Sequence, residues 1–201
     1  MPFDAVMLRA VTRELNERAL GAKIDKIQQP ERDAVVLHLR GTAGTGKLLL
    51  CASPNRARVH FTEAAMENPA APPMFCMLLR KHLSGARITD IEQPEMERAV
   101  ELCVESADEL GELSEKRLYL ELMGRNSNVI LIDETGRIVD ALRRVDYEMS
   151  EKRQVLPGLY YHEPPRQEKL DPLALEPGAL EAMLQTVLDM GRRLAERARL
   201  P

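Results

Sequence analysis

A phosphate-binding loop is the first chemistry that the residue spacing suggests. Residues 41–47 read GTAGTGK, which fits the G-x-x-x-x-G-K pattern that cradles nucleotide phosphates. That pattern also requires a Ser or Thr after the lysine to hold magnesium, and a helix that begins there. Position 48 is Leu, and residues 47–52 read KLLLCA before a turn signal, which favours a short strand. We therefore interpret residues 41–46 as a flexible hairpin loop rather than a nucleotide site.

Other catalytic or metal-binding patterns are absent from the sequence. Its four histidines are scattered, and it contains neither G-x-S-x-G nor H-E-x-x-H. The three cysteines, Cys51, Cys76 and Cys103, lie far apart in apolar runs, which is typical of buried free thiols rather than of a disulfide frame or a zinc knuckle. The residues alone therefore predict no catalytic site, no metal site and no cofactor, and they leave the function open.

The elements that must position any functional residue begin with a helix and a hairpin. Residues 4–21 carry apolar side chains at helical spacing, with Asp4 placed to cap the first turn and Gly21 placed to end the last. Residues 22–29 and 34–40 are strand-like and are joined by the turn sequence PERD.

A second helix and a series of strands follow. Residues 57–63 are strand-like, and residues 72–85 read as a helix that begins after two prolines and ends at Ser-Gly. Between residues 87 and 145, five strand-like segments succeed one another with short turns. We therefore predict an α+β fold, with a largely antiparallel sheet or two-layer sandwich and flanking helices.

The carboxy-terminal part differs in composition. We predict a main domain over residues 1–150 and a Pro-rich extended tether over 151–172. Residues 173–201 carry one apolar helical face and read as the start of a truncated helical module, a helical extension of the fold.

Composition limits the partners. The net charge is −4 and aromatic residues make up 3% of the chain, so broad counterion-driven or stacking contacts with nucleic acid have little support. Local basic clusters at 56–60, 78–83 and 142–145 still allow a local contact. The first twenty residues lack the apolar stretch of a signal peptide, so the expected location is the cytoplasm.

Four segments in order carry a resemblance to a known family. They are MPFDAVMLRAVTREL, IDKIQQPERDAVVLHLRG, NPAAPPMFCMLLRKHLSGARI and YLELMGRNSNVILID. Together they resemble the amino-terminal domain of the NFACT family of ribosome-associated quality control. Family members are far longer than this chain. The resemblance implies a fold similar to the amino-terminal domain of formamidopyrimidine-DNA glycosylases.

What the resemblance implies is a role in rescuing stalled translation. Such proteins bind the large ribosomal subunit that still holds peptidyl-tRNA, and they recruit alanyl-tRNA for template-free addition of a carboxy-terminal tail. The ribosome would supply the peptidyl-transfer chemistry. The expected role of this chain is therefore tRNA binding, ribosomal RNA binding and positioning, and not catalysis.

The resemblance also marks residues for tRNA contact. The family has an early aspartate in the first helix motif, which matches Asp4, and an Asp-Arg pair at a turn between strands. Arg98 matches the arginine of that pair, whereas Glu97 stands in place of the aspartate. An arginine forks two hydrogen bonds to phosphate or a base edge, and a neighbouring carboxylate orients it or accepts from a base amino group. Without the resemblance, Asp4 reads as a helix cap and the Glu97-Arg98 pair as a solvated turn.

Three further cations are weaker tRNA-binding candidates. Arg125 lies in the turn GRNSN, where the family commonly has His at position 126, and any hairpin could use such a turn. Arg80 and Lys81 lie near the end of the predicted second helix, where they could meet phosphates or simply complement the helix dipole.

Two alternative functions belong to other classes. Pro2 could act as the nucleophile of a DNA glycosylase or lyase, but Phe3 follows where such enzymes have glutamate, and no four-cysteine zinc finger is present. A surface adhesin that binds fibronectin follows from the family's older name, but a secretion signal and a disulfide frame are missing.

Overall fold

The protein is described here by a computed structural model. It divides into two compact units, residues 1–164 and 165–201, and all named helices and strands belong to the first. The structure describes residues 4–41, 44–95, 97–107 and 111–165, with 176, 178–179, 181–182 and 184–185. Within these residues, no helix combines the length and the apolar character needed to cross a membrane.

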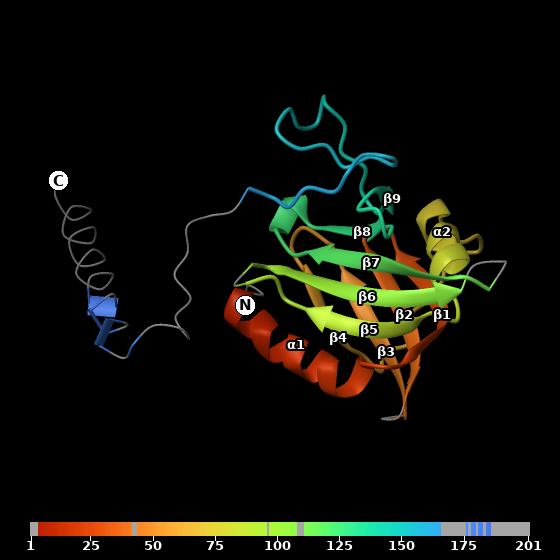
Figure 1. Cartoon of the computed structure of the whole chain (residues 1–201), viewed down its shortest axis with the longest axis horizontal. Coiled ribbons are helices and arrows are strands. Elements are labelled where there is room, and N and C mark those ends of the chain that lie inside the picture. Colours follow the sequence, from red (N-terminus) through yellow and green to blue (C-terminus); the bar gives the residue numbers. More distant parts are fainter. Residues whose placement is uncertain are drawn as a thin grey trace. The chain divides into compact units, whose positions relative to one another are not determined.

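An antiparallel sheet forms the frame of the first unit (Figure 1). Across the described residues it has nine strands in the order β4-β3-β2-β1-β5-β6-β7-β8-β9. Strands β5 to β9 are the predicted meander, so the expected largely antiparallel sheet with helices is confirmed. The similarity to the DNA glycosylase fold stays a prediction. The strands are β1 (Lys23–Glu31), β2 (Ala34–Gly41), β3 (Gly44–Cys51), β4 (Arg58–Phe61), β5 (Arg87–Glu92), β6 (Ala99–Ala107), β7 (Leu113–Glu121), β8 (Asn128–Ile132) and β9 (Ile138–Ala141).

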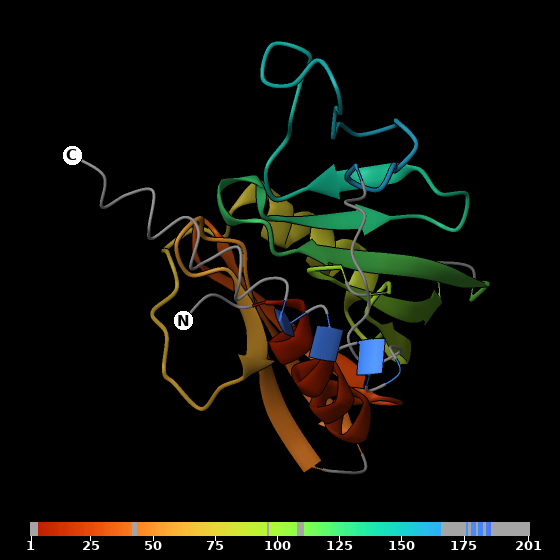
Figure 2. The ribbon, with the colours of Figure 1, turned by 90° about the vertical axis from the view of Figure 1, so that its left-hand side faces the viewer.

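The sheet consists of two halves that meet at a short junction. Strands β1 and β5 share one register pair, Lys23 with Arg87, because they run away from each other from their first residues. Four backbone hydrogen bonds, among them Ile24 N–H to the Ala86 carbonyl at 2.9 Å, complete the junction. Figure 1 shows β2 to β4 behind β5 to β8, and the turned view in Figure 2 shows the orange strands running across the green ones. The fold therefore has two layers of strands within one hydrogen-bonded sheet.

The hydrophobic core lies between these two layers. Alternate residues of each strand face inward, as the period of a half-buried strand requires. Burying each large aliphatic side chain stabilises the fold by about 1.5–3 kcal/mol, so this shared core joins the two halves far more strongly than the junction does. The inward-facing side chains include Val35, Leu37 and Leu39 of β2, and Val100, Leu102 and Val104 of β6, all at most 4% exposed.

Two helices close the core. Helix α1 (Ala5–Ala19) buries Leu8, Thr12, Leu15 and Ala19 at helical spacing. Asp4 caps it, because the Asp4 carboxylate accepts a hydrogen bond from the Met7 N–H at 2.8 Å. Helix α2 (Met74–Leu83) begins after Pro73 and contacts β1, β6 and β9. The helices predicted over residues 4–21 and 72–85 are therefore present.

The first hairpin differs from its sequence-based prediction. Strand β1 continues through Pro30 to Glu31, and the turn lies at residues 32–33 instead of PERD. The pairing of β1 with β2 shifts between Gln28 and Glu31. Proline lacks a backbone N–H, and such an irregular position tolerates it because no ladder bond is required there.

The GTAGTGK segment is part of a second hairpin, and it cannot form a phosphate-binding loop. Gly46 and Lys47 pair with Leu39 and His38 inside β3, so the lysine does not begin a helix. Strand β3 begins at Gly44, so it includes residues 44–46, which the sequence assigned to the flexible loop. Close packing explains why two of these positions are glycine. A Cβ at Gly41 would lie 3.0 Å from the Ala22 Cβ, and one at Gly46 would lie 3.0 Å from the Phe61 ring.

We expect Gly41→Ala to lower the free energy of unfolding by about 1–3 kcal/mol, because the added methyl group meets the backbone and Cβ of Ala22. Urea denaturation of the two proteins measures the difference. Gly178→Ala is the control, since a Cβ there meets nothing within 4 Å. Equal midpoints for wild type and Gly41→Ala would contradict the close packing of these strands.

The segment after β9 packs on the sheet. Isolated bridges join Val145 to Val155 and Arg137 to Tyr160. Residues 151–164, which the sequence assigns to the tether, therefore belong to the first compact unit. The rest of the predicted tether and most of the predicted helical module lie outside the described residues. Residues 178–179, 181–182 and 184–185 are helical.

Candidate nucleic-acid interface

Gln93 connects the start of α1 to the turn between β5 and β6. Its Nε2 donates one hydrogen bond to the Ala5 carbonyl at 2.9 Å and a second to the Glu97 carbonyl at 2.8 Å. Ala5 follows Asp4, the cap of α1. The structure thus brings Asp4 to the Glu97-Arg98 turn, although the two places are far apart in the sequence.

Arg98 is fixed through its backbone and exposes its side chain. The Arg98 carbonyl accepts a hydrogen bond from the Leu122 N–H at 2.8 Å, and the Glu97 N–H donates to the Pro94 carbonyl at 2.9 Å. Glu95, in the same turn, has a left-handed backbone with φ of 46°. The Arg98 guanidinium forms no hydrogen bond or ion pair with the described part of the chain. Its N–H donors are therefore available to a binding partner.

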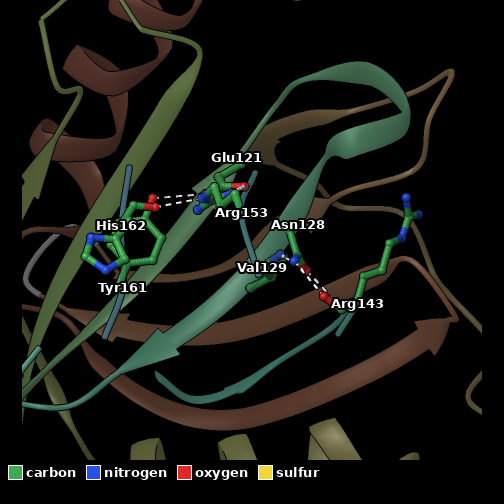
Figure 3. A network of polar contacts seen from close by, with 7 residues as sticks. All are labelled: Glu121, Asn128, Val129, Arg143, Arg153, Tyr161 and His162. Carbon is green, nitrogen blue, oxygen red and sulfur yellow. Dashed lines mark hydrogen bonds and ion pairs between the residues drawn. The ribbon is translucent and has the colours of Figure 1, made fainter. Parts of the chain in front are cut away.

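Glu121 and Arg153 form a buried ion pair (Figure 3) next to the strand end that carries Arg98. Glu121 pairs with Ala99, the residue after Arg98, at the end of β7. Its carboxylate is 1% exposed and accepts two hydrogen bonds from Arg153, at 3.1 and 2.5 Å. Arg153 Nε also donates to the His162 carbonyl at 2.7 Å. This bidentate pair attaches the segment after β9 to the strand that supports Arg98.

Two tyrosines complete the buried network. The Tyr161 hydroxyl donates to Glu121 Oε1 at 2.9 Å, and the Tyr161 and Tyr119 rings lie 4.8 Å apart. Burial, and then the charge of Glu121, raises the pKa of Tyr161 far above its ordinary value. Burial likewise raises the pKa of Tyr119. Both phenols therefore stay protonated, and Tyr161 remains a donor to the Glu121 carboxylate.

Arg125 lies in a short 3-10 helix, η1 (Gly124–Asn126), just after β7. Arg143 Nη1 donates to the Arg125 carbonyl. The Asn128 side chain in turn donates to the Arg143 carbonyl at 2.7 Å and accepts from the Arg143 N–H at 2.9 Å (Figure 3). The Arg125 side chain is exposed and has no partner among the described residues. A fixed backbone thus presents a second exposed arginine close to the strand end that holds Arg98.

A groove of about 430 Å³ runs between α1 and the end of β5. Two buried oxygens in its lining, Thr12 Oγ1 and Gln93 Oε1, have no hydrogen-bond partner among the described residues. Buried polar atoms are normally paired, so the Thr12 hydroxyl and the Gln93 amide oxygen are two unsatisfied groups behind the wall of the groove. The groove is lined by Arg9, Thr12, Arg13, Ile91, Glu92, Gln93 and Glu95.

Arg80 and Lys81 do not belong to this surface. They lie on α2, which Figure 1 shows on the opposite side of the molecule from α1. Arg80 Nε donates to the Ile27 carbonyl at 2.9 Å and thereby ties α2 to β1, while Lys81 is exposed. The structure therefore brings together Asp4, Glu97 and Arg98 with Arg125 nearby, and separates the other two. Pro2 lies outside the described residues.

Comparisons with known proteins identify the family of the chain. A family model described as NFACT N-terminal and middle domains matches residues 4–198. The chain belongs to the NFACT family. It is 45% identical over 174 residues to the Rqc2 homolog RqcH of Bacillus subtilis, which covers 86% of this chain and 30% of the relative. It is 30% identical over 141 residues to the human ribosome quality control complex subunit NEMF, which covers 70% of this chain and 12% of the relative.

Solved structures of NFACT relatives share the fold. The N-terminal domain of fibronectin-binding protein PavA from Streptococcus pneumoniae has a TM-score of 0.85 at 36% identity, over 91% of this chain and 69% of that chain. The fibrinogen binding protein from Staphylococcus aureus has a TM-score of 0.76 at 31% identity, over 87% and 61%. This NFACT chain spans about a third of the length of the RqcH relatives.

The position of Asp4 and the Glu97-Arg98 turn also depends on residues that the sequence does not single out. Gln93 looks like an ordinary turn residue in EQPEMER, and Arg153 lies in a polar stretch. Glu121 left the clearest signal, a single acid inside the apolar run LYLELM. An acid at such a position is rarely buried unless it is paired, so it calls for a cation elsewhere in the chain.

Proposed function

We propose that this NFACT chain is the tRNA-binding and large-ribosomal-subunit-binding part of a ribosome rescue factor. It recruits alanyl-tRNA for template-free tailing of stalled nascent chains, and the ribosome carries out the peptide transfer. Membership in a family whose relatives are named for ribosome quality control supports this role. The observation that carries it is the Gln93 bridge, which gathers Asp4 and the Glu97-Arg98 turn on one surface.

The chemistry of this surface suits a folded RNA. Arg98 and Arg125 are exposed guanidinium groups on fixed backbones, so each can fork two hydrogen bonds to a phosphate or a guanine edge. Asp4 uses one carboxylate oxygen for the Met7 N–H, and its second oxygen, which has no partner among the described residues, can accept from a base amino group. Thr12 and Gln93, together with Arg9 and Arg13, line the adjoining groove. Mixed charges of this kind select a particular RNA shape rather than coat any strand.

Glu97 retains the acceptor chemistry of the aspartate that the family has at this position. Glu97 is half-buried, and its carbonyl is held by Gln93. The extra methylene extends the carboxylate further from the turn, so we propose that Glu97 accepts a hydrogen bond from a base amino group at a slightly longer reach.

Binding of the 201-residue chain to deacylated tRNA across a salt series tests this function. With the two arginines Arg98 and Arg125 on phosphates, the slope of log affinity against log salt should be roughly −2. Alanyl-tRNA and a non-cognate aminoacyl-tRNA, added as competitors, test the choice of tRNA. Co-sedimentation with large subunits that carry peptidyl-tRNA tests the ribosomal partner. If the chain shows no tRNA binding and no co-sedimentation with large subunits, the proposal is contradicted.

Fibronectin binding is the second candidate function, because the similar solved structure of PavA carries that name. Immobilised fibronectin tests it directly, and Arg98→Ala separates the two functions. Fibronectin binding that persists in this variant while tRNA binding falls would place the two activities on different surfaces.

A further inference from the structure

A row of three basic side chains crosses the outer face of strands β1 to β3, on the half of the sheet that does not carry Arg98. Lys26, His38 and Lys47 are direct cross-strand neighbours. Neighbouring strands lie about 4.8 Å apart, so the two lysine backbones lie about 10 Å apart with His38 between them. His38 faces outward, since Leu37 and Leu39 on either side of it are buried in the core.

This basic row lines a hollow on the surface. The cavity has a volume of about 490 Å³, and Thr45, Thr62 and Glu63 also contribute to its lining. A smaller hollow of about 180 Å³ continues from it and shares Lys47 and Thr62. Five residues of the segment 62–68 border the smaller hollow, and Met66 among them packs on the apolar cluster beside the row. The row therefore lies in a shaped recess rather than on a flat sheet.

The two lysines in the recess have no direct partner among the described residues. Neither Lys26 nor Lys47 forms a hydrogen bond or ion pair with the described part of the chain. Asp25 also lines the recess, but Arg40 already engages it at 2.7 Å, which leaves Glu63 as the other acid. Lys26 and Lys47 lie on the two strands that flank β2 and repel each other, so an anion bound between them is favoured.

His38 is held so that it can respond to that anion. Its Nε2 lies 2.5 Å from Gln28 Oε1, an acceptor, so Nε2 carries a proton and Nδ1 is the nitrogen that titrates. Burial, and then the charges of Lys26 and Lys47, lowers the pKa of His38. A bound anion opposes the effect of the two lysines, so binding raises the pKa of His38. By linkage, anion affinity rises as the pH falls through that pKa.

We propose that Lys26, His38 and Lys47 form a binding site for a phosphate group, supplied by an RNA backbone or by a free nucleotide. Lysines act on phosphate as compact point charges with three donors each, and two of them on adjacent sides can share one group. Lys47 thus contacts phosphate from a strand, and not through the loop pattern in which the sequence places it. The site is separate from the Arg98 surface and does not depend on the function proposed for it.

The test follows the His38 Cε1–H resonance of the full chain by NMR during pH titrations with inorganic phosphate and with a short oligouridylate. We expect either probe to raise the His38 pKa and to bind more tightly at lower pH. The oligouridylate gives the cleaner pH profile because its diesters keep one negative charge throughout. Lys26→Met and Lys47→Met retain the aliphatic stems and should each weaken binding about tenfold. Lys152→Met is the control, because this exposed lysine follows β9 at the other edge of the sheet.

The probes distinguish the sources of the phosphate. Oligouridylate binding that requires both lysines, without binding of inorganic phosphate, supports the site and assigns it to an RNA backbone. If Lys26→Met and Lys47→Met weaken the binding of both probes equally, the result supports the site and assigns it to a free phosphate or nucleotide. An unchanged His38 pKa with both probes would overturn the proposal, and this result needs no variant. Equal affinities of wild type and Lys47→Met would overturn it too. Loss of tRNA binding in Arg98→Ala leaves all these outcomes unchanged, so the two proposals fail separately.

Discussion

Glu121→Gln should lower the free energy of unfolding by about 3–5 kcal/mol, because it leaves the partly buried Arg153 guanidinium without its counter-charge. The carboxylate is 1% exposed and accepts hydrogen bonds from both Arg153 and Tyr161. The amide has one acceptor oxygen in place of two, and its NH₂ group opposes the guanidinium. Urea denaturation with near-UV circular dichroism measures the loss and reports on the packing of Tyr119 and Tyr161.

Two controls make this result specific to the ion pair. Glu14→Gln removes an exposed partner of Arg18, with both side chains 46% exposed, and should change stability by no more than about 0.5 kcal/mol. Combining Glu121→Gln with Arg153→Met removes both charges and should recover much of the loss. A loss below about 1 kcal/mol for Glu121→Gln would mean that solvent compensates Arg153, contrary to the buried geometry.

Arg98→Ala should weaken tRNA binding by about 10-fold to 100-fold, which is the contribution of a hydrogen-bonded charge. It should also reduce the salt slope by about one, since one phosphate contact is lost. The Arg98 side chain is exposed and has no partner among the described residues, so its removal leaves no unpaired group inside the fold. Filter binding or fluorescence anisotropy across a salt series measures both quantities, and urea denaturation should show unchanged stability.

Two further variants define what Arg98 does. Arg98→Lys keeps the charge but loses the fork, so an intermediate affinity would indicate a bidentate contact. Arg87→Ala removes an exposed arginine at the start of β5. This position lies about one strand length, roughly 17 Å, from the end of β5 that leads to the Arg98 turn, so the variant should bind tRNA as wild type does. Equal losses for Arg98→Ala and Arg87→Ala would indicate a general charge effect and would contradict a site at the Glu97-Arg98 turn.

Much of the fold could be predicted because its signals are local. The apolar spacing of Leu8, Leu15 and Ala19, with Asp4 before it, was enough to predict α1, because the cap and the apolar face of a helix are set by residues within the helix itself. Alternation and turn residues predicted the β5 to β9 meander for the same reason. The prediction of strand ends near proline and glycine was less accurate. Pro30 lies inside β1 because an irregularity in the pairing accommodates it, and Gly46 lies inside β3 because Phe61 packs against it.

The candidate site was only partly predictable. The family resemblance marked Asp4, Glu97 and Arg98 as separate motifs, but nothing in their spacing indicated that they share one surface. Gln93 makes that connection through two backbone carbonyls, and backbone carbonyls carry no residue-type signal in a sequence. Arg80 and Lys81 had the right charge, yet α2 places them on the other side of the molecule.

The sequence by itself therefore determined the helices, most of the strands, the absence of a phosphate-loop helix after Lys47, and the family. Only the tertiary structure decided which side chains meet: Glu121 with Arg153 across 32 positions, Gln93 with Ala5 across 88, and the row that joins Lys26, His38 and Lys47. The physical reason is that periodicity and capping act between residues a few positions apart. Ion pairs and cross-strand rows depend instead on the strand order and on how the two layers of the sheet fold over one core.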